Sequence, residues 1–366
     1  MMGQMVFRNV VHRPVRTVVS ILAVAVQVTL VIIVVGLTSG MMQDAGKRIE
    51  GIGADIMLQP PSAQVFIAFS GAPMPIKLGD KLREIKYIQS YTPVLFYFNL
   101  TGGVDILYGI DPDSFRDVSG GFVFLSGHDM QGPYDMLADD VVAQSKHLTV
   151  GSTFRMLDHD FNVAGIVEHG KGARIFVQLS TLQDLTASPD KTSVFFIKCT
   201  RPDRTAAVMD EMHDIFRGYQ IRPLKDYLSL MTQTSLPGLD AFVRSMIALA
   251  VAIGFLVIFL CMYTTVIERT RDIGVLKSIG ASKGYIVKAI LGETLLICGI
   301  GIVAGILLSY LTRAAFESAF PTIHIDITIS WIVRAALISI LASLLGGIYP
   351  SYLASGKDPV EALAYD

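Results

Sequence analysis

ERTRDIGVLKSIGASKG, residues 268–284, is a charged stretch with three glycines that separates two long apolar runs. The runs on either side are Met246–Ile267 and Ala289–Leu311. About 20 predominantly apolar residues are needed to cross ~30 Å of hydrocarbon as a helix, and both runs meet this length. The charged stretch therefore connects two membrane helices and lies at one membrane face.

Two further runs, Val18–Leu37 and Trp331–Tyr352, have the same apolar character. Of the 366 residues, 52% are hydrophobic and only 17% are charged, against about 25% charged in a soluble domain. The first run is too long for a signal peptide and no small-residue cleavage site follows it, so we expect a retained anchor. The sequence predicts an α-helical membrane protein with four transmembrane helices.

Lysine and arginine gather at cytoplasmic membrane ends, and their distribution predicts the orientation. The leader carries Arg8, Arg13 and Arg16, whereas the connection 312–330 carries only Arg313. The connection between the second and third helices contains Arg269, Arg271, Lys277, Lys283 and Lys288. We therefore expect a multi-pass membrane protein with both termini in the cytoplasm.

This orientation divides the chain into nine segments. They are a basic amphipathic leader (1–17), helix 1 (18–37), a large extracytoplasmic domain (38–240), helix 2 (246–267), a cytoplasmic loop (268–288), helix 3 (289–311), an extracytoplasmic loop (312–330), helix 4 (331–352) and a cytoplasmic tail (353–366).

The extracytoplasmic domain, inserted between helices 1 and 2, has the pattern of an α+β fold. Short β-rich runs alternate with Gly, Pro and Asp turns. The expected strands are Asp55–Gln59, Val104–Ile110, Thr153–Leu157, Phe161–Val167, Arg174–Leu179 and Ser193–Lys198. The expected helices are Thr205–Arg217, with Asp203 as its cap, and Leu224–Thr232. Cys199 is the domain's single cysteine, so the domain has no internal disulfide and relies on its own core.

Within the charged stretch, Ile273, Leu276 and Ile279 recur every third residue, which favours a short helix with one apolar face. Gly280 is a natural C-terminal stop. A helix this short needs a partner, which is lipid headgroups, the chain's own helices or another protein. The alternative is a positive loop that only fixes the topology.

The stretch ERTRDIGVLKSIGAS resembles the signature loop of the FtsX/MacB-like (type VII) ABC transporter permease family. The leader RNVVHRPVRTVVSILAVAVQV (8–28) and the tail YPSYLASGKDPVEALAYD (349–366) resemble the two ends of that family. VGSTFRMLDHDFNVAGIV (150–167) looks like its periplasmic core domain. The order of one helix, a large outer domain and three helices is also the family's.

The resemblance implies a permease of the bacterial inner membrane that couples ATP hydrolysis to movement of the outer domain by mechanotransmission. The loop would be a coupling helix that docks on a cytoplasmic ABC ATPase, with two ATPase copies per transporter and a second permease copy or a paralogue. The residues carried over to this role are Glu268, Arg269, Thr270, Arg271, Asp272, Ile273, Gly274, Leu276, Ile279, Gly280 and Ala281. The implied cargo is a lipoprotein, lipid, peptide or hydrophobic toxin, with haem as a minor option. A periplasmic adaptor or carrier is a further implied partner.

A phosphate-binding loop requires GxxxxGK followed by Ser or Thr. GMMQDAGKR (40–48) has an extra residue between its glycines and ends in Arg. We therefore expect a chain without a catalytic site or cofactor, with ATP and Mg²⁺ bound by a separate ATPase. The rival function is an FtsX-like signalling module that activates an extracytoplasmic cell-wall hydrolase or sensor. A membrane-anchored enzyme is disfavoured because the outer domain lacks a recognisable catalytic set.

Polar groups within the membrane helices form a second candidate site. Glu293 stands inside helix 3, where an ionisable side chain needs a partner or a wet interior. Tyr263, Thr264 and Thr265 at the end of helix 2 are its expected hydrogen-bonding partners, and a proton or substrate role is the alternative. Gly301 and Gly305 form a small-xxx-small pair that permits close helix approach.

Metal and nucleic-acid functions find little support in the sequence. His128, His147, His159, His169 and His213 show no spacing typical of metal ligands. The formal net charge of −2 provides no basic surface for nucleic acid. Membrane lipids and other proteins are the partners that remain.

Overall fold

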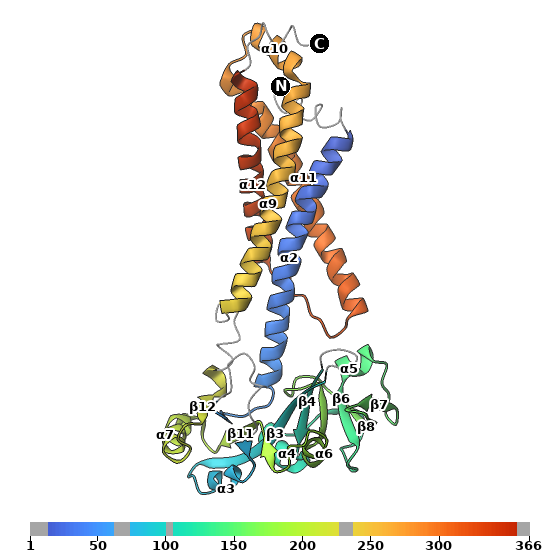
Figure 1. Cartoon of the computed structure of the whole chain (residues 1–366), viewed down its shortest axis with the longest axis vertical. Coiled ribbons are helices and arrows are strands. Elements are labelled where there is room, and N and C mark those ends of the chain that lie inside the picture. Colours follow the sequence, from blue (N-terminus) through green and yellow to red (C-terminus); the bar gives the residue numbers. More distant parts are fainter. Residues whose placement is uncertain (1–13, 62–73, 100–104, 227–236, 357–366) are drawn as a thin grey trace. The chain divides into compact units, whose positions relative to one another are not determined.

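The computed structural model describes residues 14–61, 74–99, 105–226 and 237–356. The chain divides into two compact units (Figure 1). The helical unit comprises the chain up to Gly40, Pro237–Ala319 and the chain from Ile325 onward. The α/β unit comprises Met41–Leu236 together with Phe320–His324.

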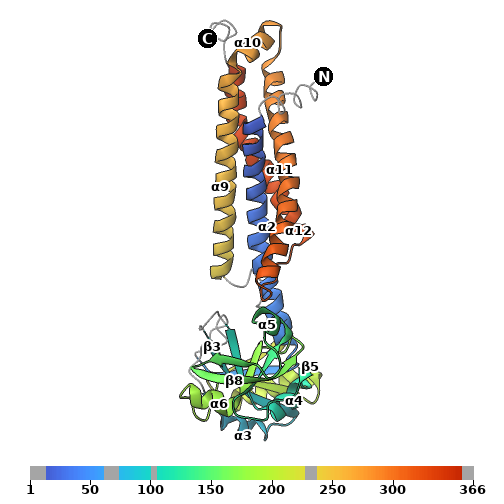
Figure 2. The same ribbon diagram turned by 90° about the vertical axis from the view of Figure 1, so that its right-hand side faces the viewer.

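The helical unit contains four long helices and a short one. They are α2 (Pro14–Glu50), α9 (Pro237–Glu268), α10 (Thr270–Ser278), α11 (Lys283–Ala319) and α12 (Ile329–Gly356). The four long helices, which run alongside one another in Figure 2, are each long and apolar enough to cross a membrane. This confirms the prediction of four apolar helices.

The helices extend beyond the apolar runs that identify them in the sequence. The helix α2 continues 13 residues past Leu37 to Glu50, and its last ten residues belong to the α/β unit. Helix formation depends on backbone hydrogen bonds and on residues that tolerate the helical conformation, such as Met41 and Lys47, rather than on hydrophobicity. The apolar run therefore marks the minimum extent of each helix.

Small residues bring α11 against α2, as the glycine pair predicts. A Cβ atom on Gly301 would lie 2.6 Å from Cβ of Val24, and one on Gly305 would lie 2.7 Å from the carbonyl oxygen of Ala25. The hydroxyl of Thr29 also donates to the carbonyl of Gly305 at 3.0 Å. Glycine at these positions is what allows the two backbones to approach.

The α/β unit is built on one ten-stranded sheet with strand order β12-β1-β11-β3-β4-β9-β6-β8-β5, in which β7 also pairs with β8. Its strands are β1 (Ile56–Gln59), β3 (Ile88–Asn99), β4 (Asp105–Ile110), β5 (Phe124–Gly127), β6 (Asp135–Asp139), β7 (Thr153–Met156), β8 (His159–Val167), β9 (Ile175–Gln178), β11 (Val194–Cys199) and β12 (Gln220–Pro223). The pairs β4–β9 and β6–β8 are parallel and the others antiparallel. A separate two-stranded sheet pairs β2 (Met74–Pro75) with β10 (Lys191–Thr192).

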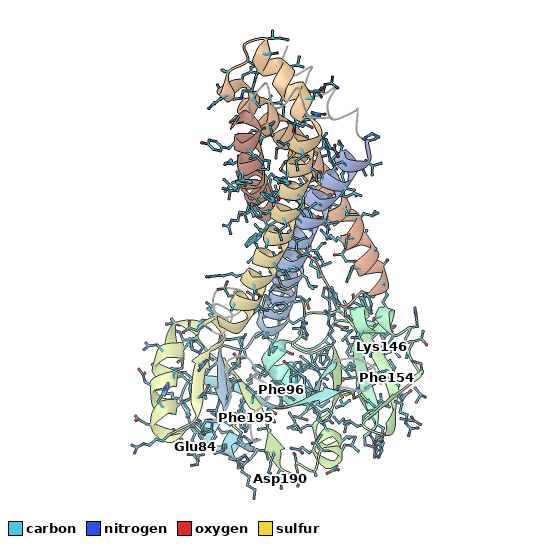
Figure 3. All side chains as sticks on the ribbon, turned by 45° about the horizontal axis from the view of Figure 1, so that its top comes forward. Glu84, Phe96, Lys146, Phe154, Asp190 and Phe195 are labelled. Carbon is cyan, nitrogen blue, oxygen red and sulfur yellow. The ribbon has the colours of Figure 1, made fainter. Side chains whose placement is uncertain are left out.

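Helices and side chains cover both faces of the main sheet. The helices are α3 (Leu78–Leu82), α4 (Pro112–Ser119), α5 (Asp140–Ser145), α6 (Leu179–Leu185) and α7 (Thr205–Ile215). Successive residues of a strand point to opposite faces. Phe195 and Phe196 of β11 accordingly belong to different buried clusters, and Phe96 packs with Phe196. Figure 3 labels Phe96 and Phe195. The mixed α and β character predicted for this domain is confirmed.

The predicted strands lie within two residues of observed ones, but the cap assigned to Asp203 is wrong. Asp203 lies in a 3₁₀ turn, Pro202–Arg204, and α7 begins after Arg204 without a side-chain cap. The leader before Pro14, most of the predicted helix 224–232 and the tail 357–366 lie outside the described residues.

Candidate functional site

The candidate site is centred on α10, which forms within the charged stretch as predicted. Gly280 follows the helix with φ of 103°, a conformation that glycine adopts without a Cβ clash. The amide of Gly280 donates to Lys277 O and that of Ala281 to Leu276 O, both at 3.0 Å. This is the Schellman arrangement, and it ends α10 sharply.

The apolar residues of α10 do not share one environment. Ile273 is 8% exposed and packs in the buried cluster of the helical unit, whereas Ile279 is 79% exposed. Leu276 is half-buried, and Val275 is exposed. The side chain of Ile273, which the sequence predicts as a docking anchor, is therefore covered by the chain's own helices. The apolar groups left open to a partner are Val275 and Ile279.

Two polar contacts connect α10 and the end of α9 that precedes it to other helices. Glu268, at the end of α9, pairs with Arg16 on α2, with Arg16 Nη1 3.2 Å from Glu268 Oε2. Lys277, near the end of α10, donates from Nζ to the carbonyl of Ser355 on α12 at 3.0 Å. The short helix is thereby connected to both α2 and α12.

The third contact involves Glu293, and it corrects the predicted partners. Arg269 Nη1 lies 3.2 Å from Glu293 Oε2, and both side chains are largely shielded from solvent. The hydroxyls of Thr264 and Thr265 donate instead to Cys261 O on their own helix. The ring of Tyr263 stacks on Phe259.

The remaining residues expected at the site have separate roles. The hydroxyl of Thr270, the first residue of α10, donates to the carbonyl of Ile267 at 2.8 Å and so strengthens the turn from α9. Gly274 is buried, whereas Arg271 and Asp272 are exposed. The surface that α10 presents therefore combines these two charges with Val275 and Ile279.

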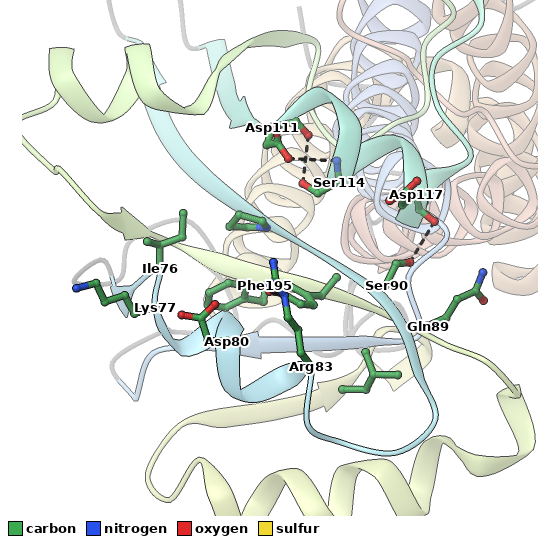
Figure 4. A pocket seen from close by; sticks show the side chains of 13 residues that line it. Ile76, Lys77, Asp80, Arg83, Gln89, Ser90, Asp111, Ser114, Asp117 and Phe195 are labelled. Atoms are coloured by element: carbon green, nitrogen blue, oxygen red, sulfur yellow. Dashed lines mark hydrogen bonds between the residues drawn. The ribbon is translucent and has the colours of Figure 1, made fainter.

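A second candidate is a hollow of about 580 Å³ in the α/β unit, between α3, β3 and α4 (Figure 4). Several of its polar groups have structural partners. Arg83 Nε donates to the hydroxyl of Tyr91 at 3.0 Å, and Asp111 caps α4 by accepting from the amide of Ser114. Lys77, Asp80 and Asp117 add charges of both signs. This mixture favours no single class of ligand. Within the described residues, no group of three His, Cys, Asp or Glu side chains is placed to hold a metal ion.

Comparison with known proteins matches two parts of the chain to two families. Residues 17–215 match the MacB-like periplasmic core domain, and residues 244–359 match the FtsX-like permease C-terminal family. The macrolide export ATP-binding/permease protein MacB of Hahella chejuensis is 24% identical over 390 residues, which cover 96% of this chain and 58% of that protein. The chain thus spans less than two thirds of the length of this relative.

Two further matches cover parts of the chain. The probable syringafactin export ATP-binding/permease protein SyfD of Pseudomonas syringae pv. syringae is 34% identical over 127 residues, covering 34% of this chain and 19% of that protein. The crystal structure of the periplasmic region of MacB from Actinobacillus actinomycetemcomitans aligns with a TM-score of 0.39 and 16% identity, covering 49% of this chain and 92% of that one.

Proposed function

Because the chain belongs to the FtsX/MacB-like ABC permease family, we propose that it couples a cytoplasmic ATPase to movement of the α/β unit outside the cytoplasm. In this proposal α10 is the coupling helix. A separate ATPase in two copies binds ATP and Mg²⁺, and the permease works as a pair with a second copy or a paralogue in the inner membrane. The cargo is a lipoprotein, lipid, peptide or hydrophobic toxin. Two relatives are named for export of macrolides and of syringafactin, which supports transport as the function.

The observation that carries this proposal is the set of contacts around α10. Arg16–Glu268, Arg269–Glu293 and Lys277–Ser355 connect α10 and its first flanking residues to α2, α11 and α12. A force applied to the exposed surface of α10 would therefore reach three long helices through short polar contacts. A loop that only fixed the topology would not need such connections.

The exposed residue Ile279 offers the sharpest test of docking. Ile279→Asp places a charge where an apolar side chain would be covered by the ATPase, and burial of an unpaired charge is strongly unfavourable. We expect co-purification of the ATPase with the permease to fall at least about tenfold, which corresponds to ~1.4 kcal/mol. ATP turnover that depends on the permease should fall in parallel.

Val15→Asp is the matched control. Val15 is 78% exposed, close to the exposure of Ile279, but it lies at the start of α2 rather than on α10. This variant should retain the ATPase.

Undiminished co-purification and turnover in Ile279→Asp would refute docking through α10. Retained ATPase binding with turnover that responds to a cell-wall hydrolase rather than to cargo would favour the signalling function.

A further inference from the structure

Arg174 connects the last turns of α2 to the sheet within the α/β unit. Its Nη2 lies 2.9 Å from Asp44 Oδ2 on α2, and its Nη1 lies 3.2 Å from Asp139 Oδ2 at the end of β6. The side chain of Arg174 is 15% exposed and that of Asp139 is 1% exposed. In such a poorly solvated place charge attraction is much stronger than in water.

Backbone and side-chain contacts reinforce both ends of this bridge. On α2, Arg48 pairs with the same Asp44 carboxylate and exchanges hydrogen bonds with Gly172, whose amide donates to Arg48 O at 2.7 Å. On the sheet, the amide of Asp139 donates to Arg174 O at 2.8 Å. Oδ1 of Asp139 also accepts from the amide of Val142 and so caps α5. Arg174 therefore joins two elements that are each firmly held.

We propose that Arg174, with Asp44 and Asp139, is the positioning residue that makes the outer end of α2 and the β6–β9 part of the sheet move as one body. This inference rests on the proposed function, in which displacement of α2 drives the α/β unit. The ion-pair chain transmits displacement because its charged hydrogen bonds are directional and fix the position of α2 against the sheet.

The surroundings of the bridge agree with a mechanical role. A hollow of about 400 Å³, lined in part by Met41, Ile106 and Ile323, adjoins Arg174. Close-packed side chains on all sides would hold α2 in place without an ion pair. The open space leaves the polar bridge as a main restraint on this side of α2.

The test measures the distance across the bridge in the full chain. Spin labels are attached to Lys47→Cys on α2 and Gln144→Cys on α5, both exposed positions, after replacement of the three native cysteines by Ser. The chain is held in vesicles of phosphatidylethanolamine and phosphatidylglycerol. We expect one narrow distance distribution, which broadens in Arg174→Gln and narrows again in Arg174→Lys. Asp44→Asn, which keeps the side-chain shape, should broaden it as well.

Arg116→Gln is the matched control. Arg116 also bridges two carboxylates, Asp113 at 3.2 Å and Asp129 at 2.9 Å, but at the surface of the α/β unit and without contact to α2. Its removal should leave the distance distribution unchanged. A distribution in Arg174→Gln and Asp44→Asn that matches the unsubstituted chain would overturn the inference.

A second measurement separates this inference from the proposed function. The co-purified ATPase is added with ATP and vanadate, and the same label pair is measured. An intact bridge should keep the distance the same in both nucleotide states, whereas Arg174→Gln should let it change. If no ATPase binds the unsubstituted chain, the proposed function fails, but the measurements without nucleotide still decide whether the bridge restrains α2.

The protonation of Asp139 provides a third measurement, the pH dependence of the distance between the labels. An ion pair elsewhere that only stabilised the fold would not change this distance. Burial raises the pKa of Asp139 to about 6, with Asp140 acting in the same direction and the Val142 amide, Arg174 and Arg48 opposing it. In the unfolded chain the pKa of Asp139 is near the ordinary value of 3.8, so the folded chain binds this proton more tightly. The contribution of Asp139 to the free energy of unfolding is therefore largest below pH 3.8 and is lost as the pH rises through about 6.

Below about pH 6 the neutral Asp139 no longer attracts Arg174 as an ion, so the distance distribution should broaden on acidification. Asp139→Asn should remove this pH dependence. The nearby imidazoles are His169, which contacts Asp140 at 3.0 Å, and His324, which lines the hollow beside Arg174, so His169→Gln and His324→Gln are the controls and should retain it. A transition that persists in Asp139→Asn and vanishes in His169→Gln would contradict the role of Asp139.

Discussion

Arg269 and Glu293 form an ion pair between the turn that precedes α10 and the first third of α11. Their side chains are 15% and 6% exposed. A buried ion pair contributes little net stability relative to well-packed apolar residues, because both charges lose their hydration. Removing one partner has a much larger effect, since the other charge then remains buried and uncompensated.

We therefore expect Glu293→Leu to destabilise the helical unit by about 3 to 5 kcal/mol, the range typical of a broken buried pair. Glu293→Gln should be tolerated better because the amide oxygen still accepts from Arg269. The double variant Arg269→Met with Glu293→Leu should recover much of the loss. Thermal unfolding of the full chain in detergent measures all three. Equal stability of Glu293→Leu and Glu293→Gln would show that Arg269 does not depend on this carboxylate.

The sequence predicts that Glu293 needs a polar partner, but it does not identify Arg269. Depth along a helix follows from counting residues, which is why the sequence places Thr264 and Thr265 near Glu293. Which side of the helix a residue faces depends on how the helices are rotated against one another, and that is a property of the packed bundle. The burial of Ile273 and the exposure of Ile279 could not be predicted for the same reason.

Among the helices, the close contact of α11 with α2 depends on the absence of side chains at two glycines. A Cβ atom on Gly301 would lie 2.6 Å from Cβ of Val24, which real packing does not permit. Gly299, two residues earlier on the same helix, has nothing within 4 Å of the point that a Cβ atom would occupy. The two positions differ in their neighbours rather than in their helix propensity.

Gly301→Leu should force α2 and α11 apart and lower the stability of the helical unit by about 1 to 3 kcal/mol, as overpacking does in other cores. Gly299→Leu is the control and should have little effect. Thermal unfolding in detergent, together with crosslinking between cysteines placed on α2 and α11, measures both outcomes. A similar loss in the two variants would mean that the effect comes from the helix itself rather than from its contact with α2.

At the level of strands, sequence patterns succeed where a run is short, apolar and bounded by turns, and they fail for β3. This strand, Ile88–Asn99, contains Pro93, which cannot donate a backbone hydrogen bond and argues against a central strand. In the sheet, Pro93 pairs with Phe195 of β11, whereas the pairing of β3 with β4 begins only at Val94. Within the described sheet, Pro93 therefore has a partner residue on the β11 side and none on the β4 side.

For the molecule as a whole, the decisive question is which membrane face carries α10. The strands and short helices of the α/β unit lie between α2 and α9 in the chain, so we predict that a membrane crossing by α9 puts them and α10 on opposite membrane faces. The excess of Lys and Arg in residues 268–288 predicts that α10 is cytoplasmic. The α/β unit is then predicted to lie outside the cytoplasm.

Cysteines placed at two exposed positions test the orientation directly. In whole spheroplasts of a cysteine-free background, a thiol reagent that cannot cross membranes should label His159→Cys in the α/β unit and not Ser282→Cys after α10. Both should react once the membrane is permeabilised, which serves as the control for accessibility. The reverse pattern would place α10 outside the cytoplasm, where no ATPase could dock, and the proposed coupling would fail. The expected effects at Glu293 and Gly301 would still hold, because they depend on packing within the helical unit and not on its orientation.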